Sequence, residues 1–392
     1  MGRLRLLLHK RILSSLIFTL FVLTLVEVFS FFLDRWLYKK GVFYIPIEIN
    51  YREYMEERDP ILGWPSPKSF GDKNRDEIGS RRTPAFPDPA KAPALVSLYG
   101  DSCAWSDEVD HEHAWGNVLS KLIGARVNNF GVGGYGTDQA CLRFEHNVQD
   151  EARIVVLCHF TENIVRNVNQ FRNLLYPTSG LGFKPRFVLD EEGKIELIPI
   201  PTFNETDFRA CIERPGDYLT HEWFLPGGGA GIQMLSFPYF LSLCKGFGQF
   251  HVRATLRGEP FYTSFYEEDH PSRALQLTEG IILRFTEKAH NKGRTPVVVI
   301  LPTGRDLQYY QKHQRWVYKN LLDRLEKCNI EFLDVGPPMF ASMGDKGILT
   351  IFGNISSHPN KEGYALIARL VFQYLKTKGY LASGPMSAAS KP

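Results

Sequence analysis

Five short apolar runs, each ending in a polar or glycine-containing turn, constrain the fold of this chain more than any other feature. They occupy residues 95–99, 126–130, 154–160, 296–301 and 330–335. Amphipathic helical patterns lie between or after them, at residues 115–123, 138–148, 272–290, 308–327 and 359–376, and Asp138 is a candidate cap for the second of these helices. Short strands that alternate with helices of roughly 12 residues are typical of βαβ units and a parallel sheet. The sequence therefore predicts an α/β fold.

The N-terminus carries a long apolar segment. Residues Ile12 to Leu33 form a run of 22 with a single charge, Glu27, and about 20 apolar residues suffice to span a bilayer. Arg3, Arg5, Lys10 and Arg11 precede the run and favour a cytoplasmic N-terminus. We predict a cytoplasmic tail at residues 1–11 and a transmembrane signal anchor at 12–33. A cleavable signal peptide is the alternative, but the run is longer than a usual h-region and no small-x-small site follows it.

The predicted topology is single-pass in the cell membrane, with the body of the protein on the extracytoplasmic side. Arg35, Lys39 and Lys40 follow the segment and weaken the charge asymmetry, so the inverted orientation stays open. Glu27 is costly in hydrocarbon unless it lies near the outer interface or pairs with another helix.

Beyond the anchor, residues 34–93 are rich in Pro, Gly, Arg and Asp, which predicts an extended lead-in with an ordered turn at 58–65. The main domain is expected at 94–378. Its rhythm breaks at about 167–271, where a hairpin at 186–199 and an aromatic segment suggest an insert. Such an insert either shapes the substrate site or packs on the sheet. The tail at 379–392 has a composition typical of disorder.

Composition excludes several functions. The formal net charge is +3, and no basic run follows the N-terminus, so nucleic acid is not an expected partner. The six cysteines are widely spaced, which favours buried free thiols such as Cys103, Cys141 and Cys158 over disulfides. His111 and His113 lack further spaced ligands, so no metal site is predicted. The glycines at 227–231 lack the Lys-Ser/Thr of a phosphate loop, and no cofactor is expected.

Candidate functional residues lie where predicted strands end. Ser102 follows the first strand within Gly100-Asp101-Ser102, a glycine-rich turn at 131–136 follows the second, and Asn163 follows the third. Open α/β sheets bind ligands at the carboxyl ends of their strands. His358 stands at the start of the last helix, whose first position suits Pro359. Each feature alone is also compatible with an ordinary turn or a surface residue.

Taken in order, Gly100-Asp101-Ser102, the turn glycine Gly134, Asn163 and His358-Pro359-Asn360 resemble the motifs of the SGNH (GDSL-type) hydrolase family. The resemblance covers roughly Leu95 to Leu375, interrupted by the insert. It implies a three-layer α/β/α sandwich with a flavodoxin-like, five-stranded parallel sheet. It also implies that Ser102 is a nucleophile and His358 its general base. The implied oxyanion hole comprises the backbone N–H groups of Ser102 and Gly134 and the side-chain amide of Asn163.

Two positions depart from the family pattern. Ile355 stands three residues before the histidine, where the family usually has the triad aspartate, and Ile164 follows the asparagine in place of a second aspartate. A carboxylate on the histidine holds its tautomer and stabilises its charged form. A backbone carbonyl can also accept the ring proton, and Asn354 or Asp334 are possible orienting groups.

The expected activity is that of a serine ester hydrolase that removes O-acetyl or short acyl groups from extracytoplasmic carbohydrate. The expected partners are an acylated carbohydrate or another small ester, and the membrane through the N-terminal helix. Three alternatives stay open: an O-acyltransferase, a membrane lipase or thioesterase, and a catalytically inactive glycan-binding protein of the same fold.

Overall fold

The computed structural model describes residues 2–69, 71, 73–177, 179–180, 182–344, 347–354 and 358–381, without the side chains of residues 2–8 and 67. The chain divides into two compact units. The first comprises residues 1–51, 171–182 and 203–261, and the second comprises residues 52–170, 183–202 and 262–392. The N-terminal segment and most of the predicted insert thus belong to one unit, and the predicted hairpin belongs to the other.

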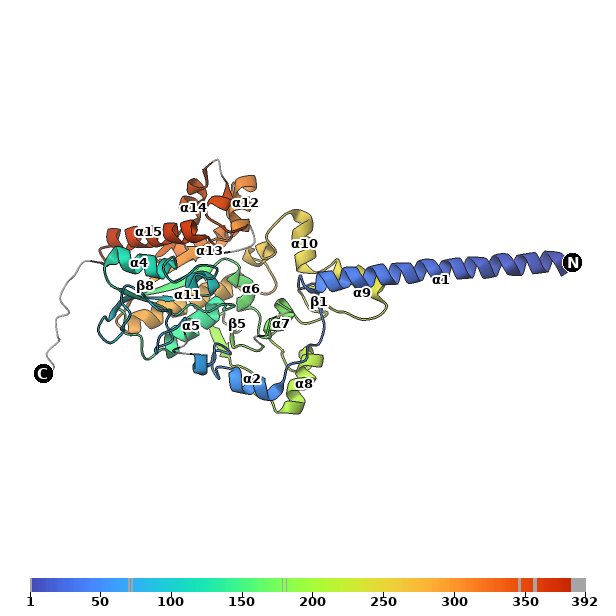
Figure 1. Ribbon diagram of the computed structural model, residues 1–392, viewed down its shortest axis with the longest axis horizontal. Coiled ribbons are helices and arrows are strands. Elements are labelled where there is room, and N and C mark those ends of the chain that lie inside the picture. The colour runs from blue at the N-terminus through green and yellow to red at the C-terminus, as the bar shows by residue number, and fades with distance from the viewer. Residues whose placement is uncertain are drawn as a thin grey trace. The chain divides into compact units, whose positions relative to one another are not determined.

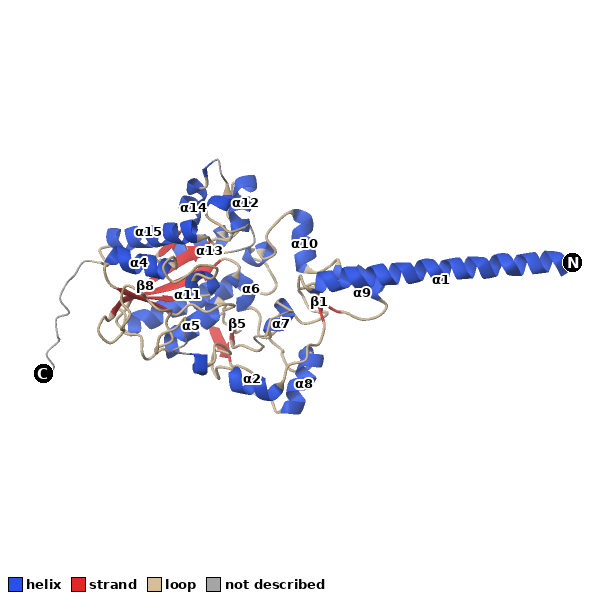
Figure 2. Cartoon of the chain, in the orientation of Figure 1, coloured by secondary structure: helices blue, strands red, loops and turns tan. Residues whose placement is uncertain are grey.

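The second unit is built on a five-stranded sheet in which every neighbouring pair is parallel (Figure 2). Its spatial order is β3-β2-β4-β8-β9. The strands are β2 (Ala94–Tyr99), β3 (Arg126–Asn129), β4 (Ile154–Phe160), β8 (Thr295–Leu301) and β9 (Phe332–Asp334). In chain order this is the 2-1-3-4-5 arrangement of flavodoxin-like sheets. The predicted α/β class, strand set and parallel topology are confirmed.

Helices cover both faces of this sheet (Figure 1). Helices α4 (Trp115–Ile123) and α15 (Lys361–Thr377) pack together on one side, and α5 (Thr137–His146) and α11 (Ala274–Asn291) pack together on the other. Burial from both sides explains why β4 is apolar along most of its length and buried at every residue. The predicted three-layer sandwich is therefore present.

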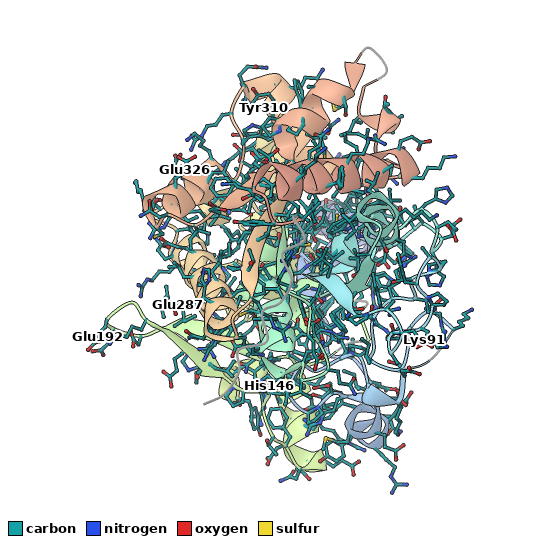
Figure 3. All side chains as sticks on the ribbon, turned by 90° about the vertical axis from the view of Figure 1, so that its left-hand side faces the viewer. Lys91, His146, Glu192, Glu287, Tyr310 and Glu326 are labelled. Atoms are coloured by element: carbon teal, nitrogen blue, oxygen red, sulfur yellow. The ribbon has the colours of Figure 1, made fainter. Side chains whose placement is uncertain are left out.

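The remaining elements of this unit are short. They are α2 (Tyr51–Glu57, which begins at the end of the first unit), α3 (Ser102–Trp105), α6 (Asn163–Asn167), α12 (Gly304–His313), α13 (Lys319–Lys327), α14 (Gly336–Ser342), β5 (Arg186–Leu189), β6 (Ile195–Ile198) and the 3-10 turns η1 (Pro67–Ser69), η3 (Thr263–Tyr266) and η5 (Ile348–Thr350). Strands β5 and β6 form the predicted antiparallel hairpin. Glu192, at its tip, projects from the molecular edge in Figure 3.

Three helix predictions were wrong in detail. The single helix predicted at 308–327 is two helices, because Gln314 adopts a left-handed conformation (φ 52°) that ends α12. Pro359 is not the first residue of the last helix; Asn360 caps α15 by accepting a hydrogen bond from the N–H of Gly363. Asp138 does not cap α5, which has Gly136 in that place.

Asp138 has another role. Its carboxylate forms an ion pair with Lys184, and both side chains are fully buried. Removing either partner of such a pair leaves an uncompensated buried charge, which typically costs about 3–5 kcal/mol.

The lead-in segment of this unit has a defined structure and contacts the glycine-rich turn at 131–136. Asp59 and Gly63 exchange backbone hydrogen bonds, which confirms the predicted turn at 58–65. Trp64 then donates from Nε1 to the carbonyl of Gly133. All six cysteines are free, and Cys103, Cys141 and Cys158 are buried as predicted.

The first unit contains one long helix and several short elements. They are α1 (Gly2–Tyr38), α7 (Arg172–Leu175), α8 (Glu205–Glu213), α9 (Tyr239–Gly246), α10 (Phe250–Arg257), the parallel pair β1 (Phe43–Tyr44) and β7 (Gln233–Met234), and the turn η2 (Pro215–Asp217). Residues His9–Tyr38 of α1 are long and apolar enough to cross a membrane. The predicted domain boundaries remain predictions, and the tail at 382–392 lies outside the described residues.

Candidate active site

Ser102 is the first residue of α3 and follows the end of β2. Asp101 caps this helix, since its Oδ1 accepts a hydrogen bond of 2.9 Å from the N–H of Cys103. The other oxygen of Asp101 accepts from Nη1 of Arg166 at 3.0 Å. These two contacts tie the residue before Ser102 to α3 and to α6, so that the serine is held at the carboxyl edge of the sheet.

Glycines allow the turns around Ser102 to pack closely. A Cβ atom on Gly100 would lie 2.6 Å from Cβ of Ala104 and 2.8 Å from Cβ of Cys158. A Cβ on Gly131 would lie 2.5 Å from the backbone nitrogen of Trp105. Gly100 is therefore required for close packing, and not for a left-handed turn. Gly134 is different, because its φ of 82° is a conformation that favours glycine.

His358 lies beside Ser102, although 256 positions separate them in the chain. Its Nε2 is 2.8 Å from Oγ of Ser102, which is hydrogen-bond distance. Its ring also stacks near Phe160 at the end of β4, with centroids 6.3 Å apart and an interplanar angle of 21°. The fold thus brings together the serine and the histidine that the sequence motifs singled out.

The opposite nitrogen of the histidine faces an acidic residue that the sequence motifs did not identify. Nδ1 of His358 lies 3.3 Å from Oε1 of Glu108. Glu108 has a left-handed backbone conformation (φ 70°), and its side chain is 52% exposed. The available signal was the acidic loop directly after α3, but nothing in its spacing relates it to residue 358.

The structure gives a different result for each of the two predicted orienting groups, Asp334 and Asn354. Asp334 accepts hydrogen bonds from the hydroxyl of Tyr318 at 3.0 Å and from the N–H of Gly336 at 2.9 Å, and burial raises its pKa to about 6. Its carboxylate is thus engaged at the start of α14, and the carboxylate at Nδ1 of His358 is that of Glu108. Asn354 is exposed and remains a prediction. Ile355 lies outside the described residues.

Asn163 is the first residue of α6, just beyond β4. Its side chain is fully buried, and neither its oxygen nor its nitrogen has a hydrogen-bond partner within the part of the chain that the structure describes. A buried amide without a partner costs about 1–3 kcal/mol. Such a group is a candidate for binding a ligand, because a bound oxygen atom could accept its N–H.

The other two predicted oxyanion donors are backbone N–H groups. Among the described residues, no backbone carbonyl accepts a hydrogen bond from the N–H of Ser102 or of Gly134. Ser102 and Asn163 follow adjacent parallel strands, β2 and β4. The edge between these strands is where the strand order reverses, the usual ligand crevice of such sheets.

Two further carboxylates lie near the site, the buried Asp101 and the half-buried Asp107. Burial raises the pKa of Asp101, and the charges of Arg166 and His358 act against that rise. Burial also raises the pKa of Asp107, with His358 again opposing it. Both acids follow β2 closely and add negative potential around the histidine.

Within the described ranges, no cluster of three His, Cys, Asp or Glu side chains has a geometry that could hold a metal ion. His113, considered with His111 in the sequence, instead places Nδ1 2.7 Å from Oδ1 of Asp110.

A scan of the sequence finds no matching protein-family model and no matching curated protein. The fold is similar to several solved structures. One is a member of the lipolytic protein G-D-S-L family from Veillonella parvula (13% identity, 72% of this chain and 97% of that chain, TM-score 0.37). Another is a GDSL-like lipase from Bacteroides thetaiotaomicron (14% identity, 72% and 88%, TM-score 0.33). A third is a catalytic mutant of an acetylxylan esterase from Geobacillus stearothermophilus (11% identity, 74% and 95%, TM-score 0.38).

At such identities and TM-scores, the likeness assigns neither an activity nor a substrate to this chain. A functional assignment therefore rests on the geometry of the residues around Ser102.

Proposed function

We propose that this chain is a membrane-anchored serine ester hydrolase of the SGNH type. The single observation that carries the proposal is the 2.8 Å separation between Oγ of Ser102 and Nε2 of His358. Serine becomes a useful nucleophile when a base within hydrogen-bond reach takes its proton. His358 has that reach, and its second nitrogen has a carboxylate neighbour in Glu108.

The proposed reaction follows from these positions. Oγ of Ser102 attacks the ester carbonyl carbon while its proton passes to Nε2 of His358. The tetrahedral intermediate collapses, the alcohol leaves with that proton, and an acyl group remains on Ser102. Water then attacks the acyl-enzyme and gives its proton to His358, which passes that proton to Oγ of Ser102 as the second tetrahedral intermediate collapses to the carboxylic acid and free Ser102.

The negative oxygen that forms in each step needs hydrogen-bond donors. The proposed donors are the N–H groups of Ser102 and Gly134 and the amide of Asn163. The buried Asn163 amide has no hydrogen-bond partner in the described part of the chain, which supports this role, since a donor already engaged would have to break a bond first. Glu108 is the proposed orienting group, which would hold the proton of His358 on Nδ1 and leave Nε2 free to accept.

The proposed substrate is an O-acetyl or short-acyl ester on extracytoplasmic carbohydrate. It rests on the expected topology, in which α1 is a single-pass anchor with a cytoplasmic N-terminus. Accessibility to protease of a tag at residue 392, in cells with a permeable outer envelope and an intact inner membrane, tests that topology. A protected tag would establish the inverted orientation.

A fluorophosphonate probe tests the nucleophile in the full-length, detergent-solubilised protein. The wild type should be labelled and Ser102→Ala should not. Ser342→Ala should be labelled like the wild type, because Ser342 is an exposed residue whose hydroxyl donates to the carbonyl of Met339 in its own helix. If folded wild-type protein is not labelled, the inactive glycan-binding alternative is favoured.

Substrate class needs separate assays. Faster cleavage of acetyl than of long-chain nitrophenyl esters would support deacetylation, and the reverse would support a lipase or thioesterase. Acetate release that falls when a glycan acceptor is added, with acylated glycan as the product, would identify an acyltransferase, because a sugar hydroxyl would then replace water in the second step.

A further inference from the structure

Helix α9 of the first unit is apolar on both of its faces. One face, formed by Tyr239, Ser242, Leu243 and Gly246, is buried or half-buried, as expected for a helix packed at i, i+3, i+4 and i+7 spacing. The exposed residues of α9 are Phe240, Leu241, Cys244 and Lys245, so the opposite face is also apolar except at Lys245 in the last turn. With the flanking residues, it presents Phe237, Phe240, Leu241 and Phe247, which are 72%, 45%, 52% and 61% exposed.

A surface helix in water normally has a polar outer face. Single exposed apolar residues are common, but three phenylalanines and a leucine on one short segment form a patch that marks contact with a partner or a membrane. We call Phe237, Phe240, Leu241 and Phe247 the α9 face.

The buried face of α9 packs against α1 (Figure 1). The carboxylate of Glu27 accepts a hydrogen bond of 2.7 Å from the N–H of Tyr239 and a longer one, 3.4 Å, from that of Phe240. The rings of Phe31 and Tyr239 pack edge to face, with centroids 5.0 Å apart. The single acidic residue of the apolar run therefore caps the first turn of α9, where the helix dipole favours a negative charge.

This contact sets the depth of α9 along α1. Lys10 and Arg11 end the basic N-terminal cluster, so a hydrocarbon core of about 20 residues that begins at Ile12 ends near Phe31. Glu27 precedes Phe31 by four residues, or about 6 Å of helix. The N-terminus of α9 then lies slightly within the hydrocarbon boundary, where Glu27 has backbone donors in place of water.

Residues just beyond this depth are typical of a membrane interface. Trp36 is exposed near the end of α1, Lys40 lies over its ring at 5.8 Å, and Arg35 lies over the ring of Phe31 at 5.2 Å. Lys39, and Lys245 in the last turn of α9, are exposed as well. Aromatic and basic side chains at this level match the headgroup region of a bilayer.

We infer that the α9 face is a second membrane contact: it lies in the leaflet around the C-terminal end of α1, at the boundary between acyl chains and headgroups. This inference rests on the proposed insertion of α1. The occupant is lipid, because Phe240, at the start of the α9 face, lies at the depth of Glu27 on the exposed apolar α1, and basic side chains border the face. The membrane anchor would then consist of the spanning helix α1 and the short interfacial helix α9 packed against it.

Spin labels on single cysteines test the inference in the full-length protein in liposomes. The background carries Cys244→Ser and Cys328→Ser, since the other cysteines are buried. Phe240→Cys and, as a second reporter, Leu241→Cys probe the α9 face. Phe18→Cys, in the middle of the apolar run, is the inserted control, and Glu213→Cys, exposed at the end of α8, is the aqueous control.

Collision with oxygen, which concentrates in lipid, is compared with collision with a water-soluble nickel complex. We expect labels at 240 and 241 to have an oxygen-to-nickel collision ratio far above that of the label at 213. Like the label at 18 they should report lipid, but at a depth closer to the membrane surface. A high nickel accessibility at 240 and 241 beside a protected label at 18 overturns the inference and leaves the anchor intact.

Two other outcomes also overturn it. Labels at 240 and 241 that neither reagent reaches would mean that a second copy of the chain covers the α9 face. A label at 18 that the nickel complex reaches would overturn the anchor and the α9 contact together. Esterase activity is independent of these results, so a failure of the proposed chemistry would be recognised separately.

Discussion

Glu108 and His358 meet through Oε1 and Nδ1, 3.3 Å apart, although 250 positions separate them in the chain. The glutamate lies six residues after Ser102, on the loop that follows α3. The two ring nitrogens of His358 therefore contact Ser102 on one side and Glu108 on the other. The acid comes from a different part of the chain than the family pattern implied. In the proposed mechanism, Glu108 stabilises the imidazolium that forms when Ser102 attacks.

Replacing Glu108 by Gln should lower kcat about tenfold and leave KM nearly unchanged. The side chain is half exposed, so solvent screens its charge and its contribution is about 1 kcal/mol, well below that of a buried triad acid. Steady-state hydrolysis of an acetyl ester measures the effect. Glu108→Asp should recover part of the lost rate if the carboxylate itself matters.

Glu112 provides the matched control for that experiment. It is exposed on the same loop and pairs with Lys121 on α4. Glu112→Gln should keep the wild-type kcat. Equal losses in the two variants would mean that Glu108 only maintains the loop.

Ser102→Ala and His358→Gln should each reduce kcat by about four to six orders of magnitude, and the double variant should be no worse than either single one. Groups that act as one unit are not additive, because the loss of either disables the other. Kinetics on the three purified proteins test this. Multiplicative losses would show that the two side chains act separately.

Asn163→Ala should reduce kcat by about 100- to 1,000-fold, the usual cost of removing one oxyanion donor. It should not reduce the free energy of unfolding by the 1–3 kcal/mol expected for a buried, hydrogen-bonded amide, because this amide has no partner among the described residues. Kinetics and denaturant unfolding on the same sample separate the two effects. A large loss of stability with normal kcat would contradict the proposed role.

His159 should make the fold sensitive to acid. It is fully buried in β4, with Nδ1 2.8 Å from the hydroxyl of Thr137 and Nε2 3.0 Å from that of Tyr266, and burial lowers its pKa to about 3. The unfolded chain takes up this proton below about pH 6.5, while the folded protein does so only near pH 3. Stability is therefore lost as pH falls through this window, by about 2 kcal/mol between pH 6.5 and 5.

The variant His159→Gln should lack this part of the pH dependence, whatever its stability at pH 7.5. Asp306 acts in the opposite direction, since burial raises its pKa to about 6, but it is present in both proteins and cancels from the comparison. His146→Gln, which changes an exposed histidine on α5, should keep the wild-type dependence. Identical pH dependence in His159→Gln and wild type would refute the prediction.

Much of the fold could be predicted from the sequence because the relevant signals are local. An apolar run such as 154–160 indicates a buried strand, and apolar residues at i, i+3 and i+4 spacing indicate which face of a helix packs inward. The same locality explains the errors: the pattern of 308–327 has no break that reveals the left-handed Gln314, and Asp138 resembles a cap until its partner Lys184 is known.

At the site, too, some features could be predicted from the sequence and others could not. Sequence alone determined the parallel sheet, the apolar N-terminal segment, the positions of Ser102 and Asn163 just beyond their strands and that of His358 shortly before the last helix. Only the tertiary structure decided that Glu108 faces Nδ1 of His358, that Asp334 is engaged elsewhere, and that Glu27 caps α9. Each of these depends on two segments far apart in the chain, and their distance is set by how the elements pack; a spacing along the sequence does not encode it.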